Sequence, residues 1–370
     1  MPTSTPELDR HPFFTRWQDP AAGVVSYVLT HHVAPIQQSF YYTSPSLAAD
    51  SRWLWFYTAF EPNPHRTLGV VSLDPDEPLV RHFPQASFSS CSPCVTPEGD
   101  SVWLCIDESV WKLHISGSMT RIASLPADYI AGRHLWRLAT HLTRSPDGRY
   151  LLLDGEIGNH SFLALASLQT GNVEVVREFQ ARHNHAQWSP HRPDCILLAQ
   201  DQQQDPITGR FIHHDLRIHL IRPDGTHYRC LTPDMPCRPY HGPCHEWWLA
   251  DGRVGFVDYD TGVWAVDLNA RREHIWKQPL CHAHSDCTGR WFCADQSPYF
   301  WNTIGCSVWR LDRATDQVTP IDTALPVPTV SRSRYHIDPH PQCSPDGRYI
   351  VYTTTRLGTV TVAISPLPAD

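Results

Sequence analysis

The sequence has little of what marks a membrane, secreted or nucleic-acid-binding protein. No apolar run reaches the ~18 residues of a membrane span, and the N-terminus shows no charged stretch followed by an apolar core, so we expect no secretory signal. Lys and Arg form no block and the net charge is -8, which argues against nucleic acid and membrane surfaces as partners. Helical periodicity is almost absent, and this favours an all-β fold.

Paired cysteine motifs are also scarce. The 12 cysteines are scattered, and the single C-x-x-C pair, Cys91 and Cys94, has no second pair at zinc-ribbon spacing. We therefore expect free thiols in a reducing compartment and a cytoplasmic protein. We expect it to act as a monomer or homodimer.

What the sequence does contain is a repeat. A polar turn followed by an apolar, β-rich run occurs seven times, with starts at Ala48, Thr96, Ser145, Ser189, Leu249, Asp286 and Ser344. The spacing is about 50 residues, the period of a β-propeller with four strands per blade. The sequence thus predicts one domain over residues 1–370, an all-β, seven-bladed β-propeller of four-stranded antiparallel blades around a central channel. Residues up to about 33 would complete the last blade or cap the ring, and QDQQQDPITGRFIHHD would be an insertion between blades.

Histidine is the compositional anomaly, with 23 residues. Four positions before the seven turns stand Ser44, Ser92, His141, His185, His245, His282 and His340. In such propellers the strand before the turn lines the channel, so equivalent positions should meet near one axis. A lone histidine here would be an ordinary lining residue, but five in register predict a functional site.

The stretch YHIDPHPQCSPDG, from Tyr335, adds further candidate ligands. His336, Asp338 and His340 alternate, so an extended chain would project them from one face. His282 lies on the neighbouring unit. Imidazoles with a carboxylate suit Mn²⁺, Zn²⁺, Ni²⁺ or Fe²⁺, so we predict a divalent metal at His282, His340, Asp338 and His336.

Several local motifs resemble the oligogalacturonate lyases, a family of seven-bladed propellers of pectin breakdown. They span about residues 30–358: DLRIH from Asp215, CHEWW from Cys244, CHAHSD from Cys281, and DPHP from Asp338 followed by SPDGRYIVYTT. The family holds a divalent cation, usually manganese, with three His and one Gln, and uses a separate His as base and an Arg.

The resemblance implies particular roles. His282 and His340 would be metal ligands, while Asp338 stands at the family's third His and Tyr335 at its Gln. The base would be His245, and Arg217 the catalytic arginine. Two more histidines are assigned by their place around the ring and not by the resemblance, and of these His185 is placed in the catalytic set. His141 is assigned to substrate binding, together with Tyr335. Trp247, Tyr299 and Trp301 are candidates for stacking on sugars.

These residues suit β-elimination from an acidic oligosaccharide. The proton at C5 of a uronate is weakly acidic, so a cation or Arg would offset charge on the carboxylate while a neutral His accepts the proton. The product would be a 4,5-unsaturated uronide. Two alternatives stay open: a lyase for another uronate, such as a rhamnosyl-glucuronate glycan, or a non-catalytic binding propeller. A glycoside hydrolase is disfavoured, because such enzymes use a pair of carboxylates and no carboxylate pair lies in register here.

Overall fold

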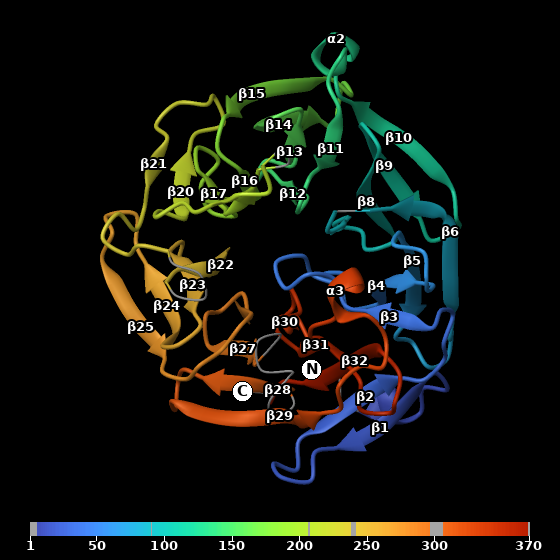
Figure 1. Cartoon of the computed structure of the whole chain (residues 1–370). Helices are drawn as coiled ribbons and strands as arrows, with labels where there is room; N and C mark the ends of the chain where they lie inside the picture. The colour runs from blue at the N-terminus through green and yellow to red at the C-terminus, as the bar shows by residue number, and fades with distance from the viewer. Residues whose placement is uncertain (1–5, 90, 206–207, 238–241, 297–305, 369–370) are drawn as a thin grey trace.

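The protein is a ring of seven antiparallel β-sheets (Figure 1). The computed structural model describes residues 6–89, 91–205, 208–237, 242–296 and 306–368. The sheets follow one another around the ring in chain order, from blue to red in Figure 1. The predicted seven-bladed β-propeller is therefore confirmed.

In the first four blades the chain starts at the inner side of each sheet and runs outward. Blade one contains β3 to β6, at Ile36–Gln38, Trp53–Ala59, Arg66–Ser72 and Val80–Phe88. Blade two contains β7 to β10, at Cys94–Val95, Ser101–Ile106, Ser109–His114 and Met119–Ser124. Blade three contains β11 to β15, at Leu135–Leu138, Thr143–Arg144, Tyr150–Ile157, His160–Ser167 and Val173–Phe179. Blade four contains β16, β17, β20 and β21, at His183–Trp188, Ile196–Gln200, Ile218–Ile221 and Arg229–Cys230.

Blades five and six repeat the same plan. Blade five contains β22 to β25, at Cys244–Trp248, Val254–Asp258, Gly262–Val266 and Arg272–Trp276. Blade six contains β26 to β29, at Ala283–Ser285, Trp291–Asp295, Cys306–Asp312 and Gln317–Leu325. The insertion expected between blades lies instead within blade four, between β17 and β20, and includes a separate two-stranded ribbon, β18 and β19, at Gln203–Gln204 and Phe211–Ile212.

The seventh blade joins the two ends of the chain. Its inner strands are β30 to β32, at Gln342–Cys343, Tyr349–Thr354 and Thr361–Pro366, and β2 and β1, at Val25–Leu29 and Phe14–Gln18, extend it outward. Tyr27 pairs with Ile364 and Val28 with Ala363. The N-terminal segment thus lies at the outer edge of the last blade, where β-pairing closes the ring without leaving β32 as an exposed edge.

The repeated turn has a local physical cause. In the turn from Ser145, the Ser145 hydroxyl donates to the Asp147 carboxylate at 2.6 Å and accepts from the Tyr150 amide at 3.0 Å. Gly148 takes φ +74°, a left-handed conformation that glycine adopts without a Cβ penalty. Ser344 and Asp346 repeat the same bond at 2.6 Å. This turn leads the chain from an inner strand into the next strand, which is mostly buried.

Helices are minor elements among the described residues. They are α1 at Pro6–Asp9, α2 at Ala127–Ile130 and α3 at Arg332–Tyr335. In the described part of the chain, no helix has the length and apolar character needed to cross a membrane. Of the three, α3 lies near the central axis (Figure 1), and it directly precedes the candidate metal ligands.

Candidate functional site

Histidines from five blades meet near the axis. The ring centroids of His141 and His185 are 4.8 Å apart, those of His245 and His282 4.2 Å, and those of His282 and His340 4.3 Å. These residues lie in or beside the innermost strands of blades three to seven. The register seen in the sequence therefore corresponds to proximity in space.

Three of these histidines share a left-handed backbone conformation, which departs from regular strand geometry. His185, His245 and His340 have φ values of +54°, +48° and +43°. The pairing register shifts across His185 in β16 and across His245 in β22, as at a β-bulge. A left-handed conformation is uncommon outside glycine, and such residues gather at functional sites.

Tyr41 lies among the histidines, and the sequence reasoning missed it. Its ring centroid is 4.8–5.9 Å from those of His340, His141, His185, His282 and His336. Burial raises the pKa of Tyr41 well above its usual value, so the hydroxyl keeps its proton at neutral pH. Tyr41 is three residues before Ser44, the register position of blade one, and only that neighbourhood could have suggested it.

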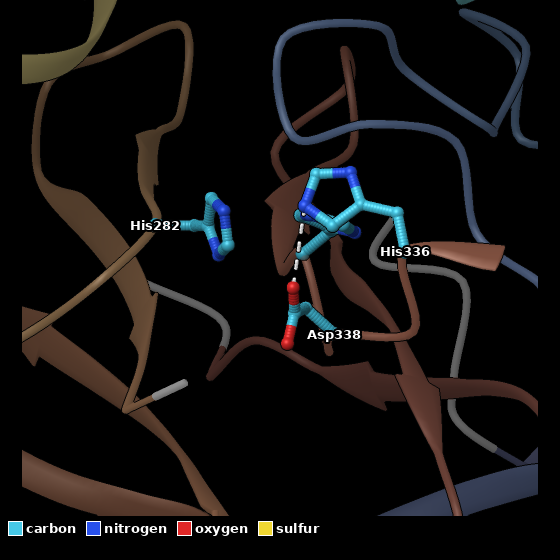
Figure 2. A group of neighbouring side chains, drawn as sticks. His282, His336 and Asp338 are labelled. Atoms are coloured by element: carbon cyan, nitrogen blue, oxygen red, sulfur yellow. Dashed lines mark ion pairs between the residues drawn. The ribbon is translucent and has the colours of Figure 1, made fainter. Parts of the chain in front are cut away.

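The four predicted metal ligands come together. One ligand atom from each of His282, His336, Asp338 and His340 lies within 4.8 Å of the others. Figure 2 shows His282 approaching from one segment and His336 and Asp338 from another, with His336 Nε2 3.3 Å from Asp338 Oδ2. All but His336 are buried. The group offers three imidazoles and one carboxylate.

Asp295, at the end of β27, holds two of these ligands in place. Its carboxylate lies 3.1 Å from His282 Nδ1 and accepts the amide N–H groups of His282 and His340, both at 3.0 Å. A carboxylate on one imidazole nitrogen directs the other toward a metal. Burial would lower the pKa of His282, but Asp295 outweighs that effect and raises the pKa. Spacing along the chain could not identify Asp295, because its partners come from two blades.

The predicted base, His245, has one nitrogen committed. Its Nδ1 bonds to the carbonyl oxygen of Cys281, which can only accept, so Nδ1 carries the proton. In the neutral ring Nε2 is then the acceptor. Burial, followed by the nearby His282, lowers the pKa of His245 well below its usual value. His245 also forms a second group of potential ligands with Cys281 and His282.

The predicted arginine, Arg217, already faces two internal carboxylates. Its Nε is 3.0 Å from Glu246 Oε2, and its Nη1 is 2.9 Å from Asp201 Oδ1. Arg217 is 7% exposed and Glu246 is fully buried. Burial would lower the pKa of Arg217, but the two carboxylates raise it well above its usual value. In this structure the guanidinium therefore neutralises internal charge.

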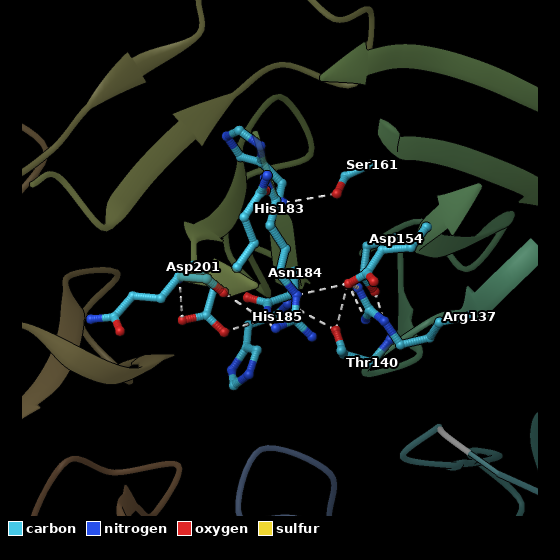
Figure 3. A network of polar contacts seen from close by, with 12 residues as sticks. Arg137, Thr140, Asp154, Ser161, His183, Asn184, His185 and Asp201 are labelled. Atoms are coloured by element: carbon cyan, nitrogen blue, oxygen red, sulfur yellow. Dashed lines mark hydrogen bonds and ion pairs between the residues drawn. The ribbon is translucent and has the colours of Figure 1, made fainter. Parts of the chain in front are cut away.

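A polar network fixes the backbone of His185 (Figure 3). The His185 amide donates to Thr140 Oγ1 at 2.8 Å, and Thr140 Oγ1 donates to Asp154 Oδ2 at 2.5 Å. Arg137 Nη1 pairs with the same Asp154 oxygen at 3.1 Å. The Nδ1 of His185 is 3.7 Å from Glu246 Oε1. The network joins blades three and four beneath the site.

Two predicted substrate-binding residues lie inside the protein. Trp247 is 1% exposed, donates from Nε1 to Ser285 Oγ at 3.1 Å and packs on Phe292. Tyr335 is fully buried, and its hydroxyl donates to the Asn63 carbonyl at 2.8 Å. Stacking on a sugar needs an exposed ring face, so Trp247 is a core residue here.

Tyr299 and Trp301, the other stacking candidates, lie outside the described residues.

A cavity of about 310 Å³ opens beside the histidines. His141, His185, His336, His340 and Tyr41 line it. Both ring nitrogens of His141, Nδ1 of His185 and Nε2 of His340 are buried without a hydrogen-bond partner in the described part of the chain. Buried polar atoms without partners are costly and are typical of binding sites. His245, His282 and Arg217 are not among the lining residues.

Together these features define a class: a seven-bladed propeller with a potential metal-binding group and a cavity at its axis. Two solved oligogalacturonate lyase structures share this fold at 16% identity, each with 96% of both chains covered. One is in complex with manganese, with a TM-score of 0.73, and the other is from Vibrio parahaemolyticus, with a TM-score of 0.74. Prolyl oligopeptidase B from Galerina marginata is less similar, at 11% identity and a TM-score of 0.51, covering 84% of this chain and 46% of that chain.

No protein-family model and no curated protein sequence matches the chain. At these identities the structural likenesses show the fold. They confirm the resemblance to oligogalacturonate lyases as one of architecture, in a chain that has diverged widely in sequence.

Proposed function

We propose that this protein is a polysaccharide lyase, a carbon–oxygen lyase that cleaves an acidic, uronate-containing oligosaccharide of oligogalacturonate type. The reaction would be metal-assisted β-elimination to a 4,5-unsaturated uronide. The observation that carries the proposal is the convergence of His282, His336, Asp338 and His340, with the imidazole of His245 4.2 Å from that of His282. A binding propeller would not need this combination of ligands and an acceptor nitrogen.

The side chains fit a divalent cation, and we propose Mn²⁺. Nitrogen and carboxylate ligands suit such ions, and the buried Nε2 of His340 has no hydrogen-bond partner among the described residues. Asp295 bonds to Nδ1 of His282 and leaves Nε2 for a ligand bond. A bound cation would supply Lewis-acid stabilisation of negative charge on the substrate carboxylate.

His245 is the proposed base. Its Nε2 accepts the C5 proton of the uronate, and the bond from Nδ1 to the Cys281 carbonyl keeps the ring in the required tautomer. Its low pKa keeps it neutral at physiological pH. The hydroxyl of Tyr41, or water, is our candidate donor for the leaving O4, because Tyr41 retains its proton.

His185 and His141 are proposed to contact the substrate. Both line the cavity and carry ring nitrogens without hydrogen-bond partners among the described residues. Burial lowers the pKa of His141 to about 4, so it is a neutral ligand for a hydroxyl or carboxylate at neutral pH.

A different uronate is the second candidate substrate. Asp338 and Tyr335 stand where the lyase family has His and Gln, and a changed ligand set favours a glucuronate-bearing glycan, such as a rhamnosyl-glucuronate. A non-catalytic binding propeller is the third candidate, and it predicts no turnover at all.

We propose a cytoplasmic location. All 12 cysteines, each within the described ranges, are free thiols, which suits a reducing compartment.

The test is an absorbance assay for unsaturated product on trigalacturonate and a glucuronate-containing disaccharide, with the purified protein and added Mn²⁺. We expect one of them to be cleaved and His245→Ala to lower turnover by about 10²–10⁴-fold. His114→Ala, on β9 away from the cavity, is the control and should retain full turnover. Absence of product with both substrates would refute the lyase, and full turnover by His245→Ala would refute the assigned base.

A further inference from the structure

Arg66, at the start of β5, has no acidic partner among the described residues. Its guanidinium packs over the Tyr57 ring at 4.7 Å, and its Nη2 donates to the carbonyl oxygen of Tyr335. No carboxylate pairs with it in the part of the chain that the structure describes. Burial lowers the pKa of Arg66 from its usual value, yet an arginine remains charged in proteins.

The other arginines beneath the site contrast with Arg66. Arg217 faces Glu246 and Asp201, and Arg137 faces Asp154 and Glu156 at 3.1 and 2.8 Å. A half-buried charge that no internal carboxylate offsets is costly unless an outside group balances it.

The cavity around Arg66 has the charge for such a group. Arg66 and Arg334 line it with four histidines, and no Asp or Glu is among its described lining residues. Arg334 is exposed and donates from Nη1 to the Pro62 carbonyl at 3.0 Å. Within the described ranges each guanidinium donates to one backbone carbonyl, which leaves most of its N–H donors for an anion. The volume of about 310 Å³ lies in the range of small-molecule sites.

We propose that Arg66, assisted at the rim by Arg334, binds the carboxylate of an acidic sugar in this cavity. The inference rests on the proposed function for the kind of anion, a hexuronate. A planar guanidinium matches a carboxylate with two parallel N–H donors. The assignment replaces Arg217, whose donors already serve Glu246 and Asp201, as the fixed positive charge that meets the substrate.

The position of Arg66 also links it to the metal-ligand group. Arg66 donates to the carbonyl of Tyr335, the residue directly before His336, and His336 and His340 line the same cavity. A uronate held at Arg66 would therefore lie against the histidines at the axis, and Arg66 would decide that acidic sugars are preferred over neutral ones.

The test compares the binding of D-galacturonate and D-glucuronate with that of D-galactose and D-glucose by calorimetric titration of the full chain. We expect the intact protein to bind at least one uronate about 10–100-fold more tightly than its neutral counterpart, the usual effect of hydrogen bonds to a charged group. Arg66→Met should abolish this ratio, and Arg334→Met should reduce it. Arg81→Met is the matched control, since Arg81 also donates to a backbone carbonyl, that of Ile115, and is not among the residues lining the cavity.

The outcomes separate this site from the proposed reaction. If the uronate preference is absent in the intact protein, or survives in both Arg66→Met and a folded Arg66→Gln, the anion site is refuted. If the preference depends on Arg66 but no uronide is cleaved, the site stands and the lyase proposal fails. Thermal unfolding of each variant identifies any that are unfolded. If the Arg66 variants are unfolded, Arg334→Met decides, because it alters an exposed side chain. A reduced uronate preference in Arg334→Met supports the anion site, and an unchanged preference refutes it.

Discussion

Removing the positive charge of Arg217 should destabilise the protein strongly. Arg217→Met leaves Glu246, which is fully buried, and Asp201, whose side chain is 27% exposed, without the guanidinium that pairs with both. Breaking a buried ion pair from one side costs about 3–5 kcal/mol in the free energy of unfolding. The reason is the uncompensated carboxylate that remains in a low-dielectric interior.

The shift in melting temperature follows from chain size. An unfolding entropy of about 2.1 cal/mol/K per residue gives about 0.8 kcal/mol/K for this chain, which has 370 residues. A loss of 3–5 kcal/mol should therefore lower Tm by about 4–6 °C. Differential scanning calorimetry and urea denaturation measure the two quantities independently.

Two further variants test the explanation. Arg217→Lys should fall between the parent and Arg217→Met, because one ammonium cannot reproduce two bonds to different carboxylates. Adding Glu246→Gln to Arg217→Met should recover part of the lost stability, because it removes the buried unpaired charge. A Tm for Arg217→Met within about 1 °C of the parent would show that the three charges are not coupled as described.

Two other outcomes are expected. Asp295→Asn should weaken Mn²⁺ binding about 10–100-fold in a metal titration, because an amide cannot accept all the hydrogen bonds from His282 and His340. Unchanged affinity would contradict that role. Burial lowers the pKa of His141, His183 and His284 to about 4, so their unfolded forms bind protons first as pH falls below about 6.5. Each of these histidines should lower the free energy of unfolding by up to about 1.4 kcal/mol for every pH unit between pH 6.5 and 4. Urea denaturation at pH 7 and pH 5 measures this, and equal stability at both would oppose it.

Much of the site could be predicted because the repeat is local. The Ser-Pro-Asp-Gly turn forms bonds within six residues, so its recurrence fixes where each inner strand ends. A constant offset from that turn then places His141, His185, His245, His282 and His340 at similar positions in successive blades. Equivalent positions in a propeller meet at the axis, so the convergence of these histidines followed from spacing alone.

Other parts of the site depend on contacts between blades. Whether Arg217 can meet a substrate depends on Glu246, which lies in the next blade and is 29 residues away in the chain. Trp247 follows Glu246 directly, but the alternation of the strand and the packing of Phe292 put its ring in the core. The roles assigned to individual residues stay predictions.

The all-β fold, the seven blades and the register of the histidines at the axis could be read from the sequence, because strand alternation and turn chemistry are short-range. Which arginines pair with internal carboxylates and which line the cavity depends on the folded chain. Tyr41, Asp295 and Arg66 enter the site through neighbours up to 300 residues away, such as the bond between Arg66 and Tyr335. Ion pairing and burial depend on distances between blades, which no spacing along the chain encodes.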